Sequence, residues 1–377
     1  MKQSHFHILC IDDDEFMLKA THRLLRRLKP EWKMDFISDP TCWQQSVDPS
    51  APPELILSDL LMPKLQGDEL LKQVATRYPS TVRALITGDS SRDIPELAGA
   101  NVHFILPKPF TESDFSYVLD SVERLYDLPL SDKARNQLAG LEALPVLPSR
   151  IRKINQALRD PDADVGHIAL MVSEEPALVA RLLQLANSAY LGFGKQTMSV
   201  EVALNRLGTT VTSALATCML AQKVFSQVSA QEHQSIVDQH LKLAGLSRNL
   251  SEQLGVAKAH QESIYLAALM SALGELVIRE MGTHQQDIES LSTIEPGRSD
   301  ALVITSYILI LWGYSLEIAQ IVLESEEEIE LTTLPQSEGQ MIWLCRQWMK
   351  QDSQTSRNQF CQQLAPQIGH FFQDWPE

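Results

Sequence analysis

The most informative residue in the sequence is Asp59, which directly follows the apolar run Leu55-Ile56-Leu57-Ser58. A short apolar run of this kind is typical of a buried strand, and Pro63 prevents a regular element from continuing far beyond it. A carboxylate at the carboxyl end of such a strand lies where open α/β sheets bind their ligands. Taken alone, Asp59 is explained more simply as a turn or helix-cap residue, so its role has to be judged from the rest of the chain.

Polar side chains stand just beyond four of the apolar runs in the first 125 residues. They are Asp12 and Asp13, Asp59, Thr87, and Lys108. Parallel strands bring their carboxyl ends to one edge of a sheet, so we expect these side chains to meet there. Four independent coincidences at one edge favour a functional site over a chance turn residue.

These residue types predict phosphoryl chemistry. Clustered carboxylates bind a hard cation that prefers oxygen ligands, Mg²⁺ before others. A metal ion beside Asp59 would neutralise an incoming phosphoryl group and allow the carboxylate to attack phosphorus as a nucleophile. A lysine supplies a positive charge for the resulting acyl phosphate, and a threonine hydroxyl can bond a phosphoryl oxygen.

Strand-like and helical patterns alternate five times before residue 126. The strands are expected at about 6–11, 33–37, 55–58, 82–86 and 102–106. The helices are expected at about 15–29, 39–47, 67–78, 95–100 and 111–126. Asp14 is expected to cap the first helix, and Thr111 begins a capping-box pattern before the last. Five strand–helix repeats predict an α/β fold with a doubly wound five-stranded parallel sheet.

This constellation resembles the receiver domain of two-component response regulators, which has a flavodoxin-like fold. The resemblance covers about residues 5–126, and we take 1–126 as the expected receiver domain. It implies that Asp12 and Asp13 are the acidic metal pair and that Asp59 is the phosphoacceptor, also in contact with the metal. It further implies that the Leu61 carbonyl is a metal ligand and that the cofactor is Mg²⁺.

The same resemblance implies a switch made of Thr87 and Lys108, with a cis peptide bond between Lys108 and Pro109. Receivers usually carry an aromatic switch residue three positions before the lysine. Here that position is Ile105, with Phe104 next to it. Either the last strand has slipped by one residue, or the aromatic half of the switch is altered.

The rest of the chain is expected to be helical, with a linker at 127–134 and a helical domain at 135–377 that includes a tail from about 335. It resembles the HD-related output domain, HDOD. The motifs that carry this resemblance lie in order between residues 144 and 208. They are Leu144-Pro-Val-Leu-Pro148, Asp160-Pro-Asp, Glu175-Pro-Ala-Leu178, Leu182-Leu-Gln-Leu-Ala-Asn-Ser-Ala-Tyr190 and Val200-Glu-Val-Ala-Leu-Asn-Arg-Leu-Gly208. Asn187 and Gly208 have residue types found at helix ends, so we expect structural roles for them rather than a ligand site.

The parent HD phosphohydrolases hold metals with a histidine, a His-Asp pair and a further Asp. His240 falls where the first histidine would lie, but the pair is replaced by Ser271-Ala272, and a later His-His position reads as the acidic run 324–329. Alanine cannot bind a metal and a neutral serine is a poor ligand. We therefore expect His240 to be a structural histidine and the output domain to be catalytically inactive. The alternative is a metal-dependent phosphohydrolase acting on a phosphoester or a cyclic dinucleotide.

For two further segments, a binding role is the alternative to a purely structural one. Residues 160–164 form a turn rich in aspartate, but they lack the glycine and the distal glutamate of a calcium loop. The tail contains several aromatic residues among polar ones. We expect two amphipathic helices there that pack on the domain, and the alternative is a docking face for a partner.

Composition limits the partners. The formal net charge is −16, made of 14 basic against 19 acidic residues in 1–125 and 18 against 29 in 126–377. This balance argues against nucleic-acid binding, which needs basic surface, and no basic recognition helix supports a transcription factor. No apolar run is long enough for a membrane helix, and the five scattered cysteines are typical of reduced thiols in the cytoplasm.

Together these patterns predict a cytoplasmic response regulator that is itself a phosphoprotein and not an enzyme. The expected phosphodonor is a sensor histidine kinase or a phosphotransfer protein. Phosphorylation would switch a protein-binding helical domain whose downstream partner the sequence does not name. A homodimer formed through the receiver is predicted by the family resemblance alone.

Overall fold

The structure is a computed structural model, and its contacts divide the chain into two compact units. The first contains Met1–Leu147 and Ile310–Leu316, and the second contains Pro148–Leu309 and Glu317–Glu377. The structure describes all residues except 1–5, 89–100, 140, 142–148, 161, 188–195, 224, 226, 283–293 and 376–377. The helix expected at 95–100 and the motif at 144–148 lie outside the described residues. Each unit is described by itself below.

The first unit contains the predicted parallel sheet. Its strands are β1 (His7–Ile11), β2 (Lys33–Ile37), β3 (Leu55–Asp59), β4 (Val82–Thr87) and β5 (Phe104–Pro107). They are all parallel, in the order β2-β1-β3-β4-β5. This is the strand order of flavodoxin-like folds, so the predicted fold class is confirmed for this unit.

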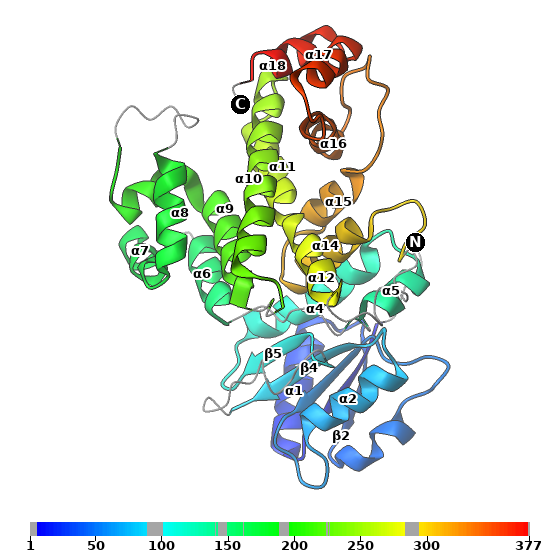
Figure 1. The fold of residues 1–377 in the computed structure, drawn as a ribbon. Helices are drawn as coiled ribbons and strands as arrows, with labels where there is room; N and C mark the ends of the chain where they lie inside the picture. The colour runs from blue at the N-terminus through cyan, green and yellow to red at the C-terminus, as the bar shows by residue number, and fades with distance from the viewer. Residues whose placement is uncertain are drawn as a thin grey trace. The chain divides into compact units, whose positions relative to one another are not determined.

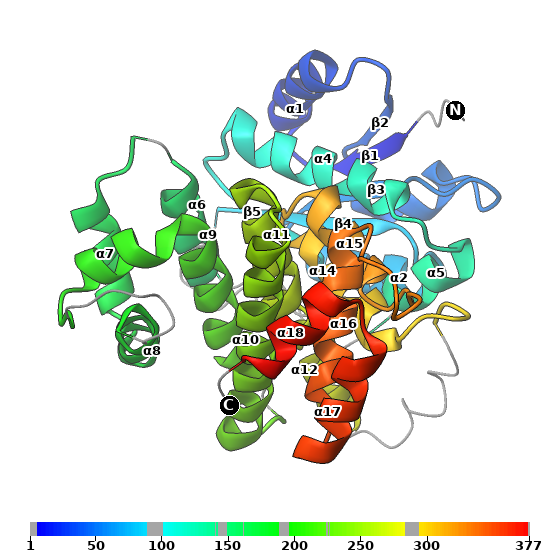
Figure 2. The same cartoon turned by 90° about the horizontal axis from the view of Figure 1, so that it is seen from above.

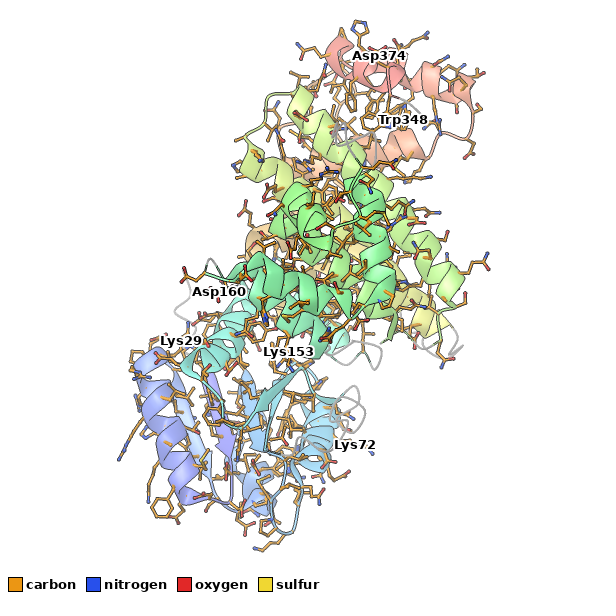
Figure 3. The ribbon with its side chains drawn as sticks, turned by 90° about the vertical axis from the view of Figure 1, so that its left-hand side faces the viewer. Lys29, Lys72, Lys153, Asp160, Trp348 and Asp374 are labelled. Carbon is orange, nitrogen blue, oxygen red and sulfur yellow. The ribbon has the colours of Figure 1, made fainter. Side chains whose placement is uncertain are left out.

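Helices cover both faces of the sheet. Helices α1 (Glu15–Leu28) and α4 (Glu112–Asp127) lie on one side, and α2 (Gly67–Arg77) lies on the other (Figures 1 and 2). Lys29 at the end of α1 and Lys72 on α2 mark the two sides in Figure 3. Alternate strand residues Leu9, Ile56 and Leu85 are buried in the core on the α2 side, which follows from the two-residue period of a strand.

Charged contacts tie α1 to α4 on their shared side of the sheet. Lys29, just beyond α1, lies 2.6 Å from Glu123 and 2.9 Å from Asp120, both on α4. The indole of Trp32 donates a hydrogen bond to the same Glu123 carboxylate at 3.1 Å. The predicted weak helix after β2 is a 3₁₀ helix, η1 (Pro40–Ser46).

A further helix follows α4 within the first unit. This helix, α5 (Asp132–Ala139), buries Ala134, Leu138 and Ala139. It begins at Ser131, whose hydroxyl accepts a hydrogen bond from the Ala134 amide, as expected of an N-cap residue. The compact unit therefore extends beyond the segment 127–134 that the sequence indicated as a linker.

The second unit is helical, as predicted, and its described residues contain no strand. Its first helices are α6 (Ser149–Arg159), α7 (Val165–Ser173), α8 (Pro176–Ala186), α9 (Val200–Leu220), the 3₁₀ helix η4 (Ala221–Lys223), α10 (Ala230–Gln253), α11 (Lys258–Met270) and α12 (Ala272–Gly282). These are followed by α14 (Asp300–Leu311), whose end falls in the first unit, and by α15 (Leu316–Glu324). Within the described part of the chain, no helix combines the length and apolar character needed to span a membrane.

Two helix boundaries show how local chemistry interrupts the helical pattern. Gly208 has a φ of +78° inside α9 and breaks that helix, because glycine adopts positive φ without a steric cost. The helical segment 258–282 is not continuous. It is divided at Ser271, whose hydroxyl donates to the Ala268 carbonyl at 2.7 Å.

The tail forms three helices where the sequence predicted two, namely α16 (Glu338–Met349), α17 (Gln354–Gln363) and α18 (Pro366–Gln373). It packs on α10 and α11, near the position of Trp348 in Figure 3. The rings of Trp348 and Phe372 stack at 5.4 Å, and both side chains are buried. Trp348 and Phe372 therefore serve packing within the unit.

The close packing of α12 on α14 predicts the effect of one substitution. A Cβ atom at Gly274 would lie 1.8 Å from the Ala301 carbonyl oxygen, while the Gly274 amide donates to Thr305 at 3.0 Å. Gly274→Ala should therefore lower the free energy of unfolding of the helical unit by about 1–3 kcal/mol, as overpacked cores do, measured by urea denaturation. The control Ser263→Ala on α11 should change it by less than about 0.5 kcal/mol, and equal stability of the two variants would contradict the prediction.

Candidate functional site

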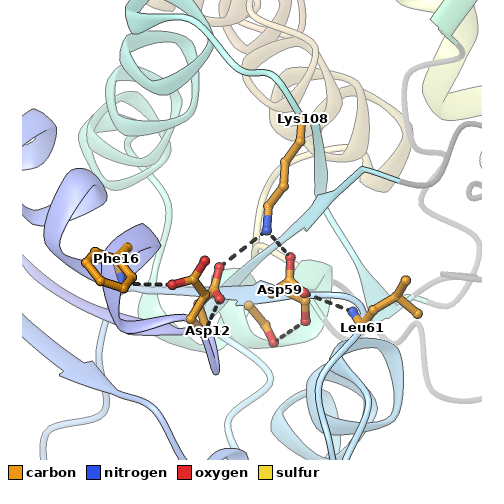
Figure 4. A network of polar contacts seen from close by, with 7 residues as sticks. Asp12, Phe16, Asp59, Leu61 and Lys108 are labelled. Atoms are coloured by element: carbon orange, nitrogen blue, oxygen red, sulfur yellow. Dashed lines mark hydrogen bonds and ion pairs between the residues drawn. The ribbon is translucent and has the colours of Figure 1, made fainter.

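The carboxyl ends of β1, β3 and β5 bring three charged side chains together. The Lys108 ammonium lies 2.5 Å from Oδ1 of Asp59 and 3.4 Å from Oδ2 of Asp12 (Figure 4). Both carboxylates are buried, with Asp59 only 6% and Asp12 only 7% exposed. Three of the residues that the sequence predicted to meet at this edge are therefore in contact.

Main-chain groups orient the two carboxylates. The Leu61 amide donates to Oδ2 of Asp59 at 3.0 Å, and the Asp14 amide donates to Oδ1 of Asp12 at 2.9 Å. Asp14 itself accepts from the Phe16 amide at 2.8 Å and caps α1, as the sequence predicted. Each carboxylate is thus held by one amide and by the shared lysine.

Gly67 allows the next helix to begin directly against the site. A Cβ atom at Gly67 would lie 2.0 Å from the Asp59 carbonyl oxygen, so any larger residue would push α2 or the end of β3 aside. The Gly67 amide donates to the Leu60 carbonyl at 2.9 Å. This contact fixes the turn that carries Asp59.

Burial and charge shift the proton affinities of the site. Burial raises the pKa of Asp12 above its ordinary value, and the nearby Asp59 charge adds to this effect, while the Asp14 amide and Lys108 oppose it. Burial alone would lower the pKa of Lys108, but its hydrogen bond and ion pair with Asp59, supported by Asp12, raise that pKa. Two buried carboxylates thus face one ammonium group. The negative charge exceeds the positive charge at this site, and an additional cation would balance it.

The donor chemistry of this edge fits Mg²⁺. The candidate donors Asp12, Asp13, Asp59 and the Leu61 carbonyl are all oxygen groups, which Mg²⁺ prefers. Among the described residues, no three acidic, histidine or cysteine side chains are close enough together to form a metal site. Asp13 is exposed, and Lys108 bridges the two buried carboxylates.

The strand register decides between the two explanations of the missing aromatic residue. Ile105 pairs with Leu85, and two residues on Pro107 pairs with Thr87, so Ile105 and Thr87 lie on the same face of the sheet. Phe104 lies on the opposite face, where its ring contacts Tyr117 edge-to-face at 5.6 Å. The strand has not slipped, and an aliphatic residue replaces the aromatic one.

Other predicted site residues lie at the expected strand ends. Thr87 is the last residue of β4 and is buried, and its carbonyl accepts from the Lys108 amide at 2.6 Å. The peptide bond between Lys108 and Pro109 is cis, as predicted. Leu61 follows Asp59 in the loop, and its side chain is 51% exposed.

Comparison with protein families agrees with this geometry. The response regulator receiver domain family matches residues 8–120, and the HDOD domain family matches residues 144–298. The chain joins a response regulator receiver domain to an HDOD domain. It therefore has the architecture of a response regulator with an HD-like output domain.

Individual proteins resemble one part of the chain or the other. An uncharacterised protein from Treponema pallidum (strain Nichols) is 27% identical over 167 residues, which are 43% of this chain and 32% of that protein, so the chain spans about a third of its length. The receiver domain of an HD domain-containing protein from Pseudomonas fluorescens Pf-5 is 27% identical and covers 32% of this chain and 89% of that one, with a TM-score of 0.30. A protein assigned as a metal-dependent phosphohydrolase from Shewanella amazonensis SB2B is 18% identical and covers 67% and 89%, with a TM-score of 0.45.

The HDOD motif residues that the structure describes hold the chain together locally. Asn187, at the end of α8, accepts a hydrogen bond from the Thr197 amide and donates one to the Thr197 carbonyl, both at 2.7 Å. Arg206 donates to the Ala186 carbonyl at 3.2 Å. Residues 188–190 of the motif lie outside the described residues. Asn187 and Arg206 thus fix the end of α8 against the start of α9, in agreement with the expected structural role of Asn187.

His240 and Ser271, which the sequence analysis compared with HD metal ligands, are bonded to main-chain carbonyls. The imidazole Nδ1 of His240 lies 3.0 Å from the Ile236 carbonyl, and burial lowers the pKa of His240 to about 4. The Ser271 hydroxyl is engaged by Ala268, and Ala272 is fully buried. His240 is a neutral imidazole held by its own helix.

Sequence reasoning missed one buried polar pair in the receiver domain. Arg83 and His103, in and beside the strands β4 and β5, are 1% and 6% exposed. The signal that could have revealed Arg83 is its position inside the apolar run Val82-Arg-Ala-Leu-Ile86, because a charged residue is rarely buried there without specific partners.

The lowered pKa of His240 predicts a pH dependence. The folded state holds the imidazole neutral down to about pH 4, whereas the unfolded chain protonates near its ordinary value of 6.5. The unfolded state therefore binds more protons in this window, and stability falls as the pH falls through it. This group should cost wild type about 1–2 kcal/mol of unfolding free energy between neutral pH and pH 4, because the ring is only partly buried and solvent weakens the effect. His240→Gln should not show this loss.

The measurement is denaturant unfolding of the HDOD part of the full chain at a series of pH values. Wild type and His240→Gln share the other buried histidines, so their difference isolates His240. If the difference in unfolding free energy between the two proteins stays constant from neutral pH to pH 4, His240 titrates normally in the folded state.

Proposed function

We propose that this protein is a response regulator in which Asp59 accepts a phosphoryl group from a sensor histidine kinase or a phosphotransfer protein. The observation that carries this proposal is the contact of Lys108 with both Asp59 and Asp12 at one edge of a receiver-type sheet. A purely structural ion pair needs one carboxylate for one lysine. A second buried carboxylate is costly and is explained by a cation that arrives with the substrate.

In the proposed reaction, a carboxylate oxygen of Asp59 attacks phosphorus, and the bond between phosphorus and the donor histidine nitrogen breaks. Asp12, Asp13, Asp59 and the Leu61 carbonyl would hold Mg²⁺. When bound, the metal neutralises the phosphoryl oxygens during transfer. Lys108 stays beside the acyl phosphate and compensates its charge, and the Leu61 amide keeps the carboxylate oriented.

The proposed switch uses Thr87 at the end of β4. Its hydroxyl would bond a phosphoryl oxygen, and the shift of β4 would favour the active conformation of the receiver. Ile105 lies on the same face as Thr87 and takes the place of an aromatic ring. The Ile105 side chain is smaller than an aromatic ring and needs less space to change rotamer.

The HDOD domain is proposed to act as a non-catalytic module that binds a downstream protein in the cytosol. The engagement of His240 and Ser271 by main-chain carbonyls supports this assignment. A homodimer through the receiver is part of the same proposal. The phosphohydrolase alternative predicts a bound transition metal in the purified protein and hydrolysis that is lost in His240→Ala.

Phosphorylation provides a direct test of the proposed phosphoacceptor. Incubation of the full chain with a small-molecule phosphodonor and Mg²⁺ should add one phosphoryl group, detected by intact-protein mass spectrometry. Asp59→Asn should abolish the addition, and Lys108→Met should slow it by about tenfold or more, because the charge that balances the phosphoryl group is lost.

Asp14→Asn is the matched control, since Asp14 caps α1 and has no proposed role in transfer. It should leave the rate within about twofold of wild type, because an asparagine also caps a helix. Phosphorylation of Asp59→Asn at the wild-type rate would refute the assignment of Asp59.

A second prediction concerns the output. In pull-downs from source-cell lysate with the full chain as bait, recovery of a specific protein should change when beryllofluoride and Mg²⁺ mimic the phosphorylated state. The change should be absent with Asp59→Asn. Identical recoveries with and without the mimic would mean that the receiver does not control partner binding.

A further inference from the structure

Arg83 on β4 is a buried cation whose donors reach several segments of the first unit. Its Nε donates to the Asn101 carbonyl at 2.7 Å, and one terminal nitrogen donates to the carbonyls of Pro79 and Thr81 at 3.0 and 2.9 Å. The other terminal nitrogen donates to the Ala139 carbonyl at 2.9 Å. One guanidinium group therefore joins the loops at the amino ends of β4 and β5 to the end of α5.

The contact with Ala139 stabilises the carboxyl end of α5. The last carbonyls of a helix have no partner within the helix and carry its partial negative charge, so a buried guanidinium is a favourable partner. The ring of His103 also hydrogen-bonds to the Ala139 main chain, and burial together with Arg83 keeps its pKa well below the ordinary value. His103 is thus a neutral ring whose Nδ1 accepts from the Arg83 amide at 3.1 Å.

The amino end of α5 is held by a different arginine. Arg135 donates to the carbonyls of Tyr126, Leu128 and Leu130 at 3.0, 2.6 and 2.9 Å. These acceptors lie in and directly after the end of α4. Helix α5 is therefore fixed to α4 through Arg135 and to the sheet through Arg83.

Strand β4 connects this anchor to the proposed phosphoacceptor site. Arg83 is its second residue and Thr87 its last, a separation of roughly 13 Å along an extended strand. At the site end, the Leu60 amide donates to the Ile86 carbonyl at 2.9 Å, and Asp59 pairs with Ile86. Strand β4 therefore forms a continuous main-chain link between the Asp59 site and Arg83.

We propose that Arg83 is a positioning residue that couples the state of Asp59 to α5. Through the Ala139 carbonyl it makes α5 a part of the receiver that follows the movement of β4. The coupling rests on the proposed phosphorylation of Asp59, whereas the anchoring of α5 by Arg83 does not. The effect of phosphorylation would then leave the receiver through the end of α5, and not through the end of α4.

Hydrogen–deuterium exchange of the full chain tests both parts. In wild type, the amides of α5 should be protected, and beryllofluoride with Mg²⁺ should change their exchange rate by at least about twofold. In Arg83→Met, the same amides should exchange at least about tenfold faster without the mimic, and the response of α5 to the mimic should disappear. Peptides covering Asp59 report whether the mimic has bound.

Two further variants keep the result interpretable. Arg26→Met removes an exposed arginine from α1 and should leave α5 exchange and its response unchanged. Arg83→Lys keeps the charge but cannot reach all the carbonyls, so it should give an intermediate increase and carries the test if Arg83→Met fails to fold by circular dichroism.

Each negative result has one meaning. Wild-type protection of α5 in both Arg83 variants would overturn the anchor. A mimic that protects the Asp59 peptides but leaves α5 unchanged in wild type would overturn the coupling. A mimic that fails to protect the Asp59 peptides would instead contradict the proposed phosphoacceptor, and the comparison without mimic would still decide the anchor.

Discussion

The receiver depends on the charge balance among Asp12, Asp59 and Lys108. Two carboxylates with little access to water sit at the end of neighbouring strands and share one ammonium group. In such surroundings each charge must be compensated by ions or hydrogen bonds. This balance depends on the amides of Leu61 and Asp14, on the turn fixed by Gly67 and on the strand order of the sheet. A site of this kind responds strongly to any added charge.

Two polar side chains elsewhere in the chain are satisfied mainly by the main chain. The buried Arg83 donates to carbonyls of loops and of a helix end, and the partly buried Asn187 both donates to and accepts from the Thr197 backbone. They organise connections, whereas the site at Asp59 uses side-chain charges that a ligand can alter.

In the HDOD domain, Ser271 and Ala272 lie at the junction between α11 and α12, where the Ser271 hydroxyl donates to the Ala268 carbonyl. His240 is a neutral ring bonded to its own helix. These contacts contribute to packing and to helix boundaries.

The sequence alone determined the α/β sheet, the helical second part and the residues that meet at Asp59, because strand and helix periods and the ends of parallel strands follow from local pattern. It could not decide which face Ile105 occupies, since that depends on pairing between β4 and β5. Nor could it reveal that a helix after the receiver is anchored by Arg83. Both features depend on strand pairing or hydrogen bonds between distant segments, and only the tertiary structure brings those segments within reach.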